Sequence, residues 1–405
     1  MLTRGLVAVV EHGLFATANF VLNVLLARWL LAEEYGYFAA MFAVLIGIGA
    51  IHTALFIEPM LVFGAGVYRR HRTIYIRFLV VTTLFLSIAA ALLGALLLLP
   101  VATISENWLG VFALLWATPF VTGVWLLRRA SLVLERYRYV AYAGAGYLFI
   151  MLLAVVLART AQILTPNFAL FIVGTMNLVV GIWLVDRVVG WRRENVPRRF
   201  AYHVIVRHWA YGRWSLVSAL LLWIPGNILF LTVPLTSGLE EAGALRALFN
   251  LALPMLHVFS AVSVVFIPRF VTLTGTALRV LFAKVLAFSS ACALLYCILL
   301  GIVGERLLQL LYASRYDDAA VGLWWVGGLV VASAMMGVFA TLLRAKEKLK
   351  PVAAGYLAAA GVAGTTGILF AIEWGVEGAA AGMALSYVSA ALVMAIFVRQ
   401  VLIRG

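Results

Sequence analysis

The sequence predicts an all-α, polytopic membrane protein made of two six-helix bundles. Three observations lead to this prediction. The chain is 65% hydrophobic and only 11% charged, with a mean hydropathy of +1.08, which is more apolar surface than a soluble chain of 405 residues could bury. It contains twelve apolar stretches long enough to cross a bilayer. The second half of the chain also repeats features of the first half.

A membrane-spanning helix needs about 20 apolar residues, because a hydrocarbon core of ~30 Å is crossed at ~1.5 Å per residue. The twelve stretches are apolar on most faces, which favours helices over barrel strands. The first stretch is too long for the apolar part of a cleavable signal peptide, so we expect none. The predicted spans are residues 6–31, 37–62, 78–100, 108–128, 139–158, 168–188, 214–236, 243–268, 281–303, 320–343, 351–372 and 378–398.

The chain has a net charge of +14, and the distribution of its lysines and arginines indicates the membrane topology. If the N-terminus is cytoplasmic, nearly all of the 30 lysines and arginines fall in inner loops or at inner span ends. The five in the outer half are Arg28, Arg159, Arg246, Arg306 and Arg315. This asymmetry predicts that both termini lie inside, and it removes the reason to expect nucleic-acid binding.

Several short motifs recur at a nearly constant offset. Glu33-Glu34-Tyr35-Gly36 precedes the second span, and Glu240-Glu241-Ala242-Gly243 precedes the eighth span 207 residues later. Gly146-Tyr147-Leu148 recurs as Gly355-Tyr356-Leu357, 209 residues later. Six spans per copy is an even number, so both copies enter the membrane from the same side and form a parallel repeat.

The repeat divides the chain into two predicted lobes. We expect an N-terminal lobe at residues 1–190, a C-terminal lobe at 214–405, and a basic cytoplasmic linker at 191–213. Two parallel repeats leave a cleft near the membrane midplane, which rocking of the lobes would expose to each side in turn. This arrangement predicts a transporter.

Polar residues inside three of the spans share helix faces that would front this cleft. At ~100° per residue, three polar residues of the first span fall within about 40° of one another, as do three of the eighth span. Two polar residues of the seventh span also share a face. The resulting substrate-binding candidates are His12, Asn19, Asn23, Arg213, Asn227, Arg246, Asn250 and His257.

Each candidate also has a structural interpretation. The asparagines can hydrogen-bond neighbouring helices, the histidines can be satisfied in the core, and Arg246 can extend to the outer interface. If Arg246 faces the cleft, its guanidinium offers two parallel hydrogen bonds to a phosphate group. Glu58 at the inner end of the second span is a candidate for a gate, a proton-coupling site or a structural ion pair. Asp186 and Arg187 are expected to form an interfacial pair.

Four motifs carry a family resemblance. Asn19-x3-Asn23-x3-Ala27-Arg28-x-Leu30-x4-Tyr35-Gly36-x-Phe38 opens the chain, and Leu310-Leu311-Tyr312-x3-Tyr316-x2-Ala319 precedes the tenth span. Arg344-x-Lys346-x-Lys348 precedes the eleventh span, and Gly375-Val-Glu377-Gly378 precedes the twelfth. Together they resemble the Wzx-like polysaccharide flippases of the multidrug/oligosaccharidyl-lipid/polysaccharide (MOP) superfamily.

This resemblance implies two six-helix bundles in the V shape of MATE and other MOP transporters, around a cationic cavity. It implies that an undecaprenyl-diphosphate-linked oligosaccharide is moved from the inner to the outer leaflet by alternating access, for cell-surface or exopolysaccharide biosynthesis. The implied partners are this lipid-linked glycan, membrane lipids, and polysaccharide polymerase or export machinery. No cofactor or metal site is predicted, and coupling to an H+ or Na+ gradient is left open.

Two other functions remain open. A MATE-like small-molecule antiporter that extrudes cations would favour acidic residues in the cleft, yet the carboxylates within the spans are few and lie near span ends. An integral-membrane polysaccharide polymerase, ligase or acyltransferase would need a sizeable outer loop or an outer cluster of acidic and histidine residues. The outer turns are short, so we expect a transporter rather than an enzyme.

Overall fold

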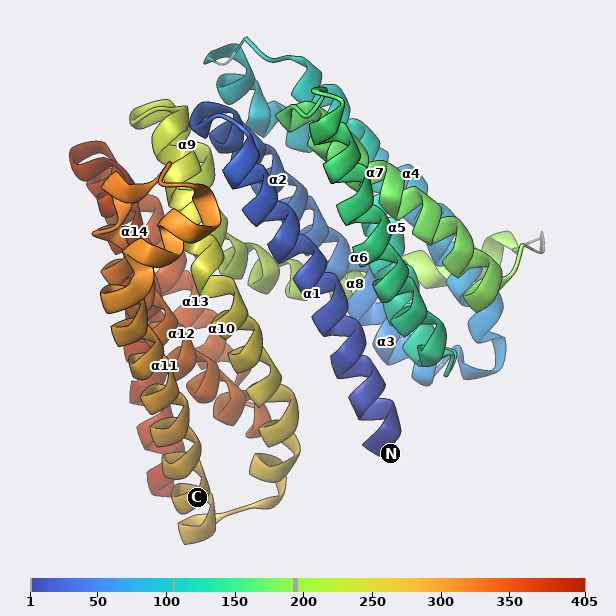
Figure 1. The fold of residues 1–405 in the computed structure, drawn as a ribbon. Helices are drawn as coiled ribbons and strands as arrows, with labels where there is room; N and C mark the ends of the chain where they lie inside the picture. The colour runs from blue at the N-terminus through green and yellow to red at the C-terminus, as the bar shows by residue number, and fades with distance from the viewer. Residues whose placement is uncertain (1, 105, 192–195, 405) are drawn as a thin grey trace. The chain divides into compact units, whose positions relative to one another are not determined.

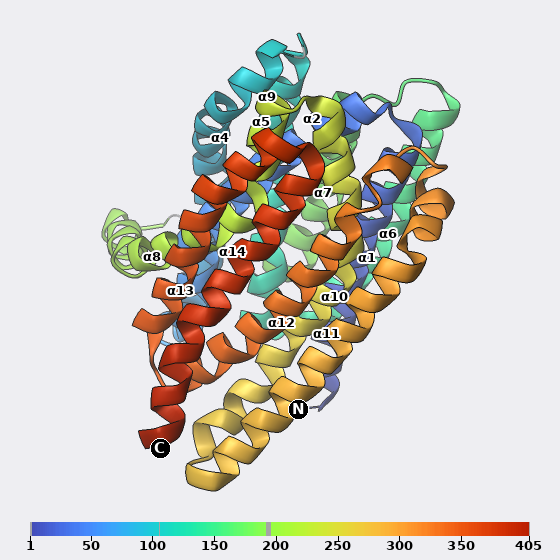
Figure 2. The same ribbon diagram turned by 90° about the vertical axis from the view of Figure 1, so that its left-hand side faces the viewer.

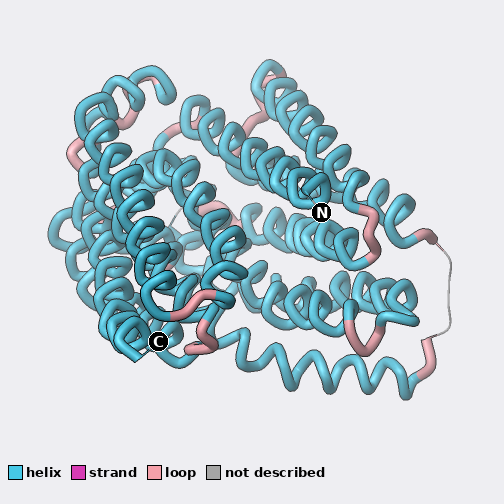
Figure 3. The backbone as a smooth tube through the Cα atoms, turned by 90° about the horizontal axis from the view of Figure 1, so that it is seen from below, coloured by secondary structure: helices cyan, strands magenta, loops and turns pink. Residues whose placement is uncertain are grey.

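The computed structural model describes residues 2–104, 106–191 and 196–404, and these residues contain helices and connecting loops but no β-strand (Figure 1, Figure 3). Short π-helical or 3-10 turns interrupt or join several helices: η1 (Thr53–Ile57), η2 (Arg69–His71), η3 (Val185–Val189), η4 (Asp317–Ala319) and η5 (Ala363–Gly367). The α-helices are α1 (Leu2–Trp29), α2 (Ala32–His52), α3 (Glu58–Ala65), α4 (Arg72–Ile104), α5 (Leu109–Val133), α6 (Tyr137–Thr160), α7 (Pro166–Leu184), α8 (Arg198–Asn227), α9 (Leu229–Thr236), α10 (Leu239–Thr272), α11 (Gly275–Tyr312), α12 (Gly322–Ala345), α13 (Leu349–Val362) and α14 (Ile368–Arg404).

All twelve predicted spans lie in helices. Within the described residues, nine helical stretches are long and apolar enough to cross a membrane, and α8 with α9, bent by 41°, makes a tenth. Gly13–Trp29 of α1 is a shorter apolar helix. The 55-residue stretch Leu349–Ile403 contains two predicted spans, because the backbone reverses at Gly375, where φ is +54°. Beyond this turn, Gly382 packs directly against Gly367.

The chain forms two compact units. Residues 1–30 and 40–220 form the first, and residues 31–39 and 221–405 form the second. The predicted lobe boundaries at 190 and 214 stay a prediction. The structure adds a feature that the sequence did not predict. Residues 31–39, which form the end of the α1–α2 turn and the beginning of α2, belong to the second unit.

Much of the predicted linker at 191–213 is helical. Residues 192–195 lie outside the described part of the chain, but α8 begins at Arg198. Its basic sequence still has a packing face, because His208 is buried. The His208 ring nitrogens lie 2.9 Å from the Leu55 carbonyl oxygen and 2.6 Å from the Tyr75 hydroxyl. The region predicted to be a basic linker therefore contains the beginning of a long helix.

A three-helix layer occurs in each unit. In the first unit α5 packs against both α4 and α7, and in the second α12 packs against both α11 and α14. The helices of the second layer face the viewer in Figure 2. The second unit's layer has a continuous apolar core, in which Phe282 of α11 lies 6.1 Å from Phe339 of α12 between ring centres. These layers hold the long helices in register, and the candidate site lies on α10, which packs against α12.

Candidate functional site

Arg246 of α10 is buried inside the second unit. Its side chain is 4% exposed, and it is the only Asp, Glu, Lys or Arg among the buried polar residues of the described chain. The guanidinium carbon lies 5.2 Å from the centre of the Phe230 ring, within cation–π range. The hydroxyls of Tyr35 and Tyr312 also interact with the guanidinium. Aromatic faces and hydroxyl groups therefore surround a cation inside an apolar span.

Asn250 lies one helical turn after Arg246 and is fully buried. Its Nδ2 donates a 2.7 Å hydrogen bond to the Tyr35 hydroxyl. Its Oδ1 is buried with no hydrogen-bond partner, at a cost of about 1–3 kcal/mol. A buried amide oxygen without a donor is an acceptor available to a ligand hydroxyl.

Two further tyrosines complete the surroundings of Arg246. Tyr312 donates a 3.2 Å hydrogen bond to the Ala247 carbonyl, and the Tyr316 ring lies 5.6 Å from the Tyr312 ring and 6.5 Å from the Tyr35 ring. Burial raises the pKa of the Tyr316 hydroxyl well above its usual range, so this hydroxyl stays neutral. We call the whole group the Arg246 cluster: Tyr35, Phe230, Arg246, Asn250, Tyr312 and Tyr316.

Two glycines allow the opening of α2 to lie directly on α10. A Cβ atom added to Gly36 would lie 1.8 Å from the Leu239 carbonyl oxygen, and one added to Gly243 would lie 2.3 Å from the Ala32 carbonyl oxygen. The two contacts are equivalent, because Ala32 and Leu239 are 207 residues apart, as are Gly36 and Gly243. The repeated Glu-Glu-x-Gly motif thus packs one copy against the other and holds Tyr35 over α10.

Several other predicted binding residues satisfy their polar groups within their own helices. Asn23 is buried and donates a 2.8 Å hydrogen bond to the Asn19 carbonyl. Asn227 donates a 3.1 Å hydrogen bond to the Trp223 carbonyl. These bonds give the amide nitrogens of Asn23 and Asn227 a partner in the preceding turn, whereas Asn19 contributes only its backbone carbonyl. A binding role for Asn19, Asn23 and Asn227 stays a prediction.

The remaining candidates are not gathered around Arg246. Arg213 and His257 are exposed, and the side chain of His12 lies outside the described residues. Of the three polar residues predicted to share one face of α10, the structure brings Arg246 and Asn250 into one cluster, whereas His257 lies beyond it. Helical phase predicts the direction in which a side chain points. It does not predict how many turns of that helix face are covered by neighbouring side chains.

The first unit contains a different polar group. Glu58 is half-buried, and the Ser215 hydroxyl donates a hydrogen bond to its carboxylate. The same unit contains two buried histidines, His52 and His208, that were not among the predicted site residues. His52 Nε2 lies 3.1 Å from Thr83 Oγ1. The π-helical turn Thr53–Ile57 interrupts the regular helix between His52 and Glu58 and contains Leu55, the backbone partner of His208. The sequence signal for these histidines was their occurrence beside or within apolar stretches.

No protein-family model and no curated protein sequence matches this chain. Solved structures do match over nearly its whole length. An inward-facing multidrug resistance MATE family transporter of the MOP superfamily aligns with a TM-score of 0.76 at 12% identity, covering 98% of both chains. The lipid II flippase MurJ, in an inward closed conformation, aligns with a TM-score of 0.71 at 11% identity, covering 98% of this chain and 88% of MurJ.

A third similar structure is a MOP superfamily transporter from Pyrococcus furiosus, described as having a binding pocket of reverse polarity that suggests a different function. It aligns with a TM-score of 0.64 at 10% identity, covering 98% of this chain and 93% of that protein. Identities this low establish the fold alone. The predicted fold is therefore confirmed: the chain has the helical fold of MATE and other MOP superfamily transporters.

Proposed function

We propose that the chain moves an undecaprenyl-diphosphate-linked oligosaccharide from the inner to the outer leaflet of the bacterial cytoplasmic membrane. The proposal places it in the Wzx-like polysaccharide branch of the MOP superfamily, as the motifs around Asn19 and Tyr312 suggest. The fold it shares with a lipid II flippase is compatible with this transport. A shared fold cannot distinguish a lipid-linked glycan flippase from a drug exporter. The residues of the candidate site must distinguish the two functions.

The single observation that carries the proposal is the charge of the buried polar groups. In the described chain, the buried polar residues include Arg246 but no aspartate or glutamate. A guanidinium binds phosphate with two parallel charge-assisted hydrogen bonds. The free Oδ1 of Asn250 adds an acceptor suited to a sugar hydroxyl. This combination suits an anionic, hydroxyl-rich ligand better than an organic cation.

In this proposal the opening of α2 acts as a cover over the binding groups. Tyr35 accepts the Asn250 hydrogen bond and interacts with Arg246, so the guanidinium reaches a ligand only when residues 31–39 move away from α10. The substrate diphosphate would then replace the tyrosine hydroxyl as the partner of Arg246. Alternating access needs a contact that closes and reopens in this way.

The test is transport of a fluorescent undecaprenyl-diphosphate oligosaccharide in proteoliposomes, measured by quenching of the label exposed on one leaflet. Replacing Arg246 with Met keeps much of its apolar volume but removes every donor. We expect the transport rate to fall about 100-fold, because two charge-assisted hydrogen bonds together contribute roughly 3 kcal/mol. The matched control is Arg306→Met, an exposed arginine of the same unit, which should transport at the wild-type rate.

If Arg246→Met inserts normally, keeps its thermal stability and transports at the wild-type rate, Arg246 is not part of the binding site. Equal losses in Arg246→Met and Arg306→Met would indicate a general effect of lowering the positive charge. A neutral polyprenyl-linked sugar carried as fast as the diphosphate form would contradict recognition through phosphate.

A small-molecule antiporter is the second candidate, and the half-buried carboxylate of Glu58 is the observation that favours it. Its coupling group would be Glu58, whose carboxylate accepts a hydrogen bond from Ser215. This function predicts efflux of organic cations that depends on the pH gradient in the wild type and loses that dependence in Glu58→Gln. Absence of any organic-cation efflux by the wild type would exclude it.

A further inference from the structure

The first unit contains an apolar groove built from residues that the Arg246 cluster does not use. It has a volume of about 780 Å³ and is lined by α4, α5, α7 and the turn that follows α7. Helix α5 packs against both α4 and α7 and forms the floor, while α4 and α7 form the walls. We refer to it as the α4–α5–α7 groove.

The lining of this groove is mostly apolar. Its floor includes Gly123, where an added Cβ would meet only Leu84 of α4, at 3.9 Å. Val81 on one wall is 54% exposed and Ile182 on the other is 50% exposed. These helices are long and apolar enough to cross a membrane. A groove along them would therefore be exposed to the acyl chains of the bilayer, so we expect it to bind an apolar chain.

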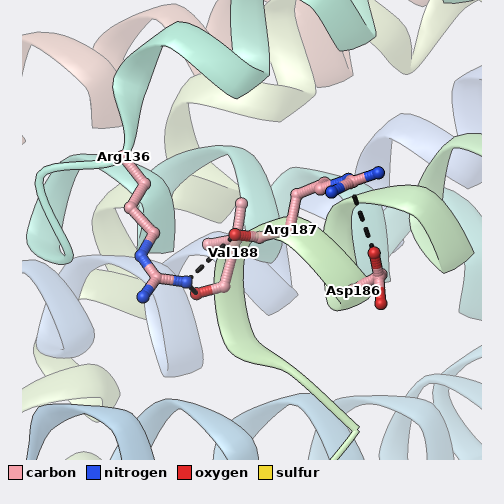
Figure 4. A network of polar contacts seen from close by, with 4 residues as sticks. All are labelled: Arg136, Asp186, Arg187 and Val188. Atoms are coloured by element: carbon pink, nitrogen blue, oxygen red, sulfur yellow. Dashed lines mark hydrogen bonds and ion pairs between the residues drawn. The ribbon is translucent and has the colours of Figure 1, made fainter.

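One end of the groove is cationic. Arg77 lines the groove and donates from Nε and Nη2 to the Val189 carbonyl, at 3.2 and 2.8 Å. Beside it, Arg136 donates from Nη1 to the Arg187 and Val188 carbonyls, at 3.0 and 3.1 Å (Figure 4). These hydrogen bonds orient both guanidinium groups at the end of α7. Arg77 belongs to the lining, whereas Arg136 and Arg187 are exposed residues outside it. We call these three residues the arginine rim.

The arginine rim also contains the predicted interfacial pair and an aromatic anchor. Arg187 Nε lies 3.4 Å from Asp186 Oδ2, which confirms the predicted pair, and three arginines with one aspartate leave the rim positive. Trp191 lines the same groove and is 64% exposed. Tryptophan is typical of the membrane–water interface. The groove therefore combines an apolar channel with a cationic, interfacial end.

We propose that the α4–α5–α7 groove binds one anionic glycerophospholipid, with its phosphate at the arginine rim and an acyl chain along α5. On α4 the lining extends from Ile74 to Leu84, which is about 15 Å of helix. This length equals half of the ~30 Å hydrocarbon thickness, so it fits a chain confined to one leaflet. A polyprenyl chain is longer than one leaflet and fits less well. Guanidinium groups favour a phosphate head group.

The test is native mass spectrometry of the full chain in detergent, with phosphatidylglycerol or phosphatidylcholine of identical acyl chains added. We expect one phosphatidylglycerol to be retained with at least about tenfold preference, since charge-assisted hydrogen bonds to phosphate provide the discrimination. Arg136→Gln should reduce this preference while leaving phosphatidylcholine binding unchanged. The measurement uses binding alone, so its outcome is independent of the transport assay.

Two variants fill the groove and one matched control does not. Gly123→Phe places a ring on the floor, and Val81→Trp adds volume from an exposed wall position if the first variant does not fold. Either should abolish retention of phosphatidylglycerol. The control is Gly146→Phe, at an exposed glycine of α6 with no atom within 4 Å of an added Cβ, which should retain the lipid.

Three results would overturn the proposal. The first is equal retention of phosphatidylglycerol and phosphatidylcholine, which indicates ordinary annular lipid. The second is undiminished retention in a folded groove-filling variant. The third is displacement of phosphatidylglycerol by an equal concentration of undecaprenyl phosphate, which would assign the groove to a polyprenyl chain.

Discussion

The two units share a packing plan but fill it differently. In each unit an arginine near the start of one helix donates to a carbonyl near the end of another: Arg77 to Val189 in the first, and Arg279 Nε to Leu402, at 2.7 Å, in the second. In the second unit Phe282 is part of the apolar core of the α11–α12–α14 layer. In the first unit the α4–α5–α7 layer leaves a groove of about 780 Å³. The second unit has a smaller cavity of about 450 Å³ at the ends of α11, α12 and α14, lined by Lys346 and Lys348.

The buried polar groups differ in the same way. The first unit buries the imidazoles of His52 and His208, which bond to hydroxyl and carbonyl groups. The second buries the guanidinium of Arg246. Two halves with the same backbone plan thus provide different chemistry, an apolar channel in one and a covered cation in the other. The two proposals assign lipid binding to the first unit and anion recognition to the second.

The largest effect should come from the glycine contact of the second unit. In Gly36→Val, the new side chain would overlap the Leu239 carbonyl, since even a Cβ would lie 1.8 Å from it. Backbone atoms cannot yield as a side-chain tip does, so we expect a loss of at least about 3 kcal/mol. The measurement is thermal unfolding in detergent, with Gly146→Val as the matched control. Equal stability of the two variants would show that residues 31–39 do not pack on α10.

The next effect concerns the cover over the cation. Tyr35→Phe leaves Asn250 Nδ2 without its 2.7 Å partner, which should destabilise the protein by about 2 kcal/mol. In the double variant with Asn250→Leu, the loss should be smaller than the sum of the single losses by about 1 kcal/mol. Strict additivity would mean that these side chains do not interact.

The corresponding change in the first unit should be milder. Tyr75→Phe removes the hydroxyl that lies 2.6 Å from His208 Nε2 and should cost about 1 kcal/mol, as expected for a neutral hydrogen bond. Unfolding by denaturant provides the comparison with Tyr35→Phe. A larger loss for Tyr75→Phe would reverse the predicted order and place the more constrained polar network in the first unit.

The smallest effect should distinguish the two arginine contacts at the helix ends. Arg77→Gln loses two hydrogen bonds at a partly buried carbonyl, whereas Arg279→Gln loses one at an exposed position. We expect losses of about 1 kcal/mol and of about 0.5 kcal/mol or less. Paired thermal scans at low salt would measure the difference, and identical losses would argue that both arginines act only on the helix dipole.

Hydropathy was sufficient to predict the twelve spans, because bilayer thickness sets the length of an apolar helix. It gave no sign that residues 31–39 pack with the second unit, since that assignment depends on a tertiary contact. Gly36 and Gly243 belong to the sequence repeat, but a repeat identifies matching motifs and not contact partners. The beginning of α8 at Arg198 was not predicted, because the many basic residues there were interpreted as a linker. Its packing face includes His208, which becomes buried only in the folded structure.

The candidate site was predictable only in part. Helical phase selected Arg246 and Asn250 together, because residues four apart share a face. It could not select Tyr35, which precedes the second predicted span, or Phe230, which is an ordinary apolar residue of the seventh. Only the fold places these two residues beside the guanidinium. The α4–α5–α7 groove was not predictable, since a groove is set by which side chains fail to fill a layer. Arg77 and Arg279 lie 202 residues apart, outside the offset of the sequence repeat.

The most direct test asks whether the cover over Arg246 opens during transport. In a variant with Asn250→Cys as the sole thiol, made with Cys292→Ala and Cys297→Ala, the rate of modification by a water-soluble maleimide is measured in proteoliposomes. We predict slow modification without substrate and at least about tenfold faster modification when undecaprenyl-diphosphate oligosaccharide is added, because binding would separate Tyr35 from α10. A rate that stays slow while the variant transports substrate would contradict a binding role for the Arg246 cluster.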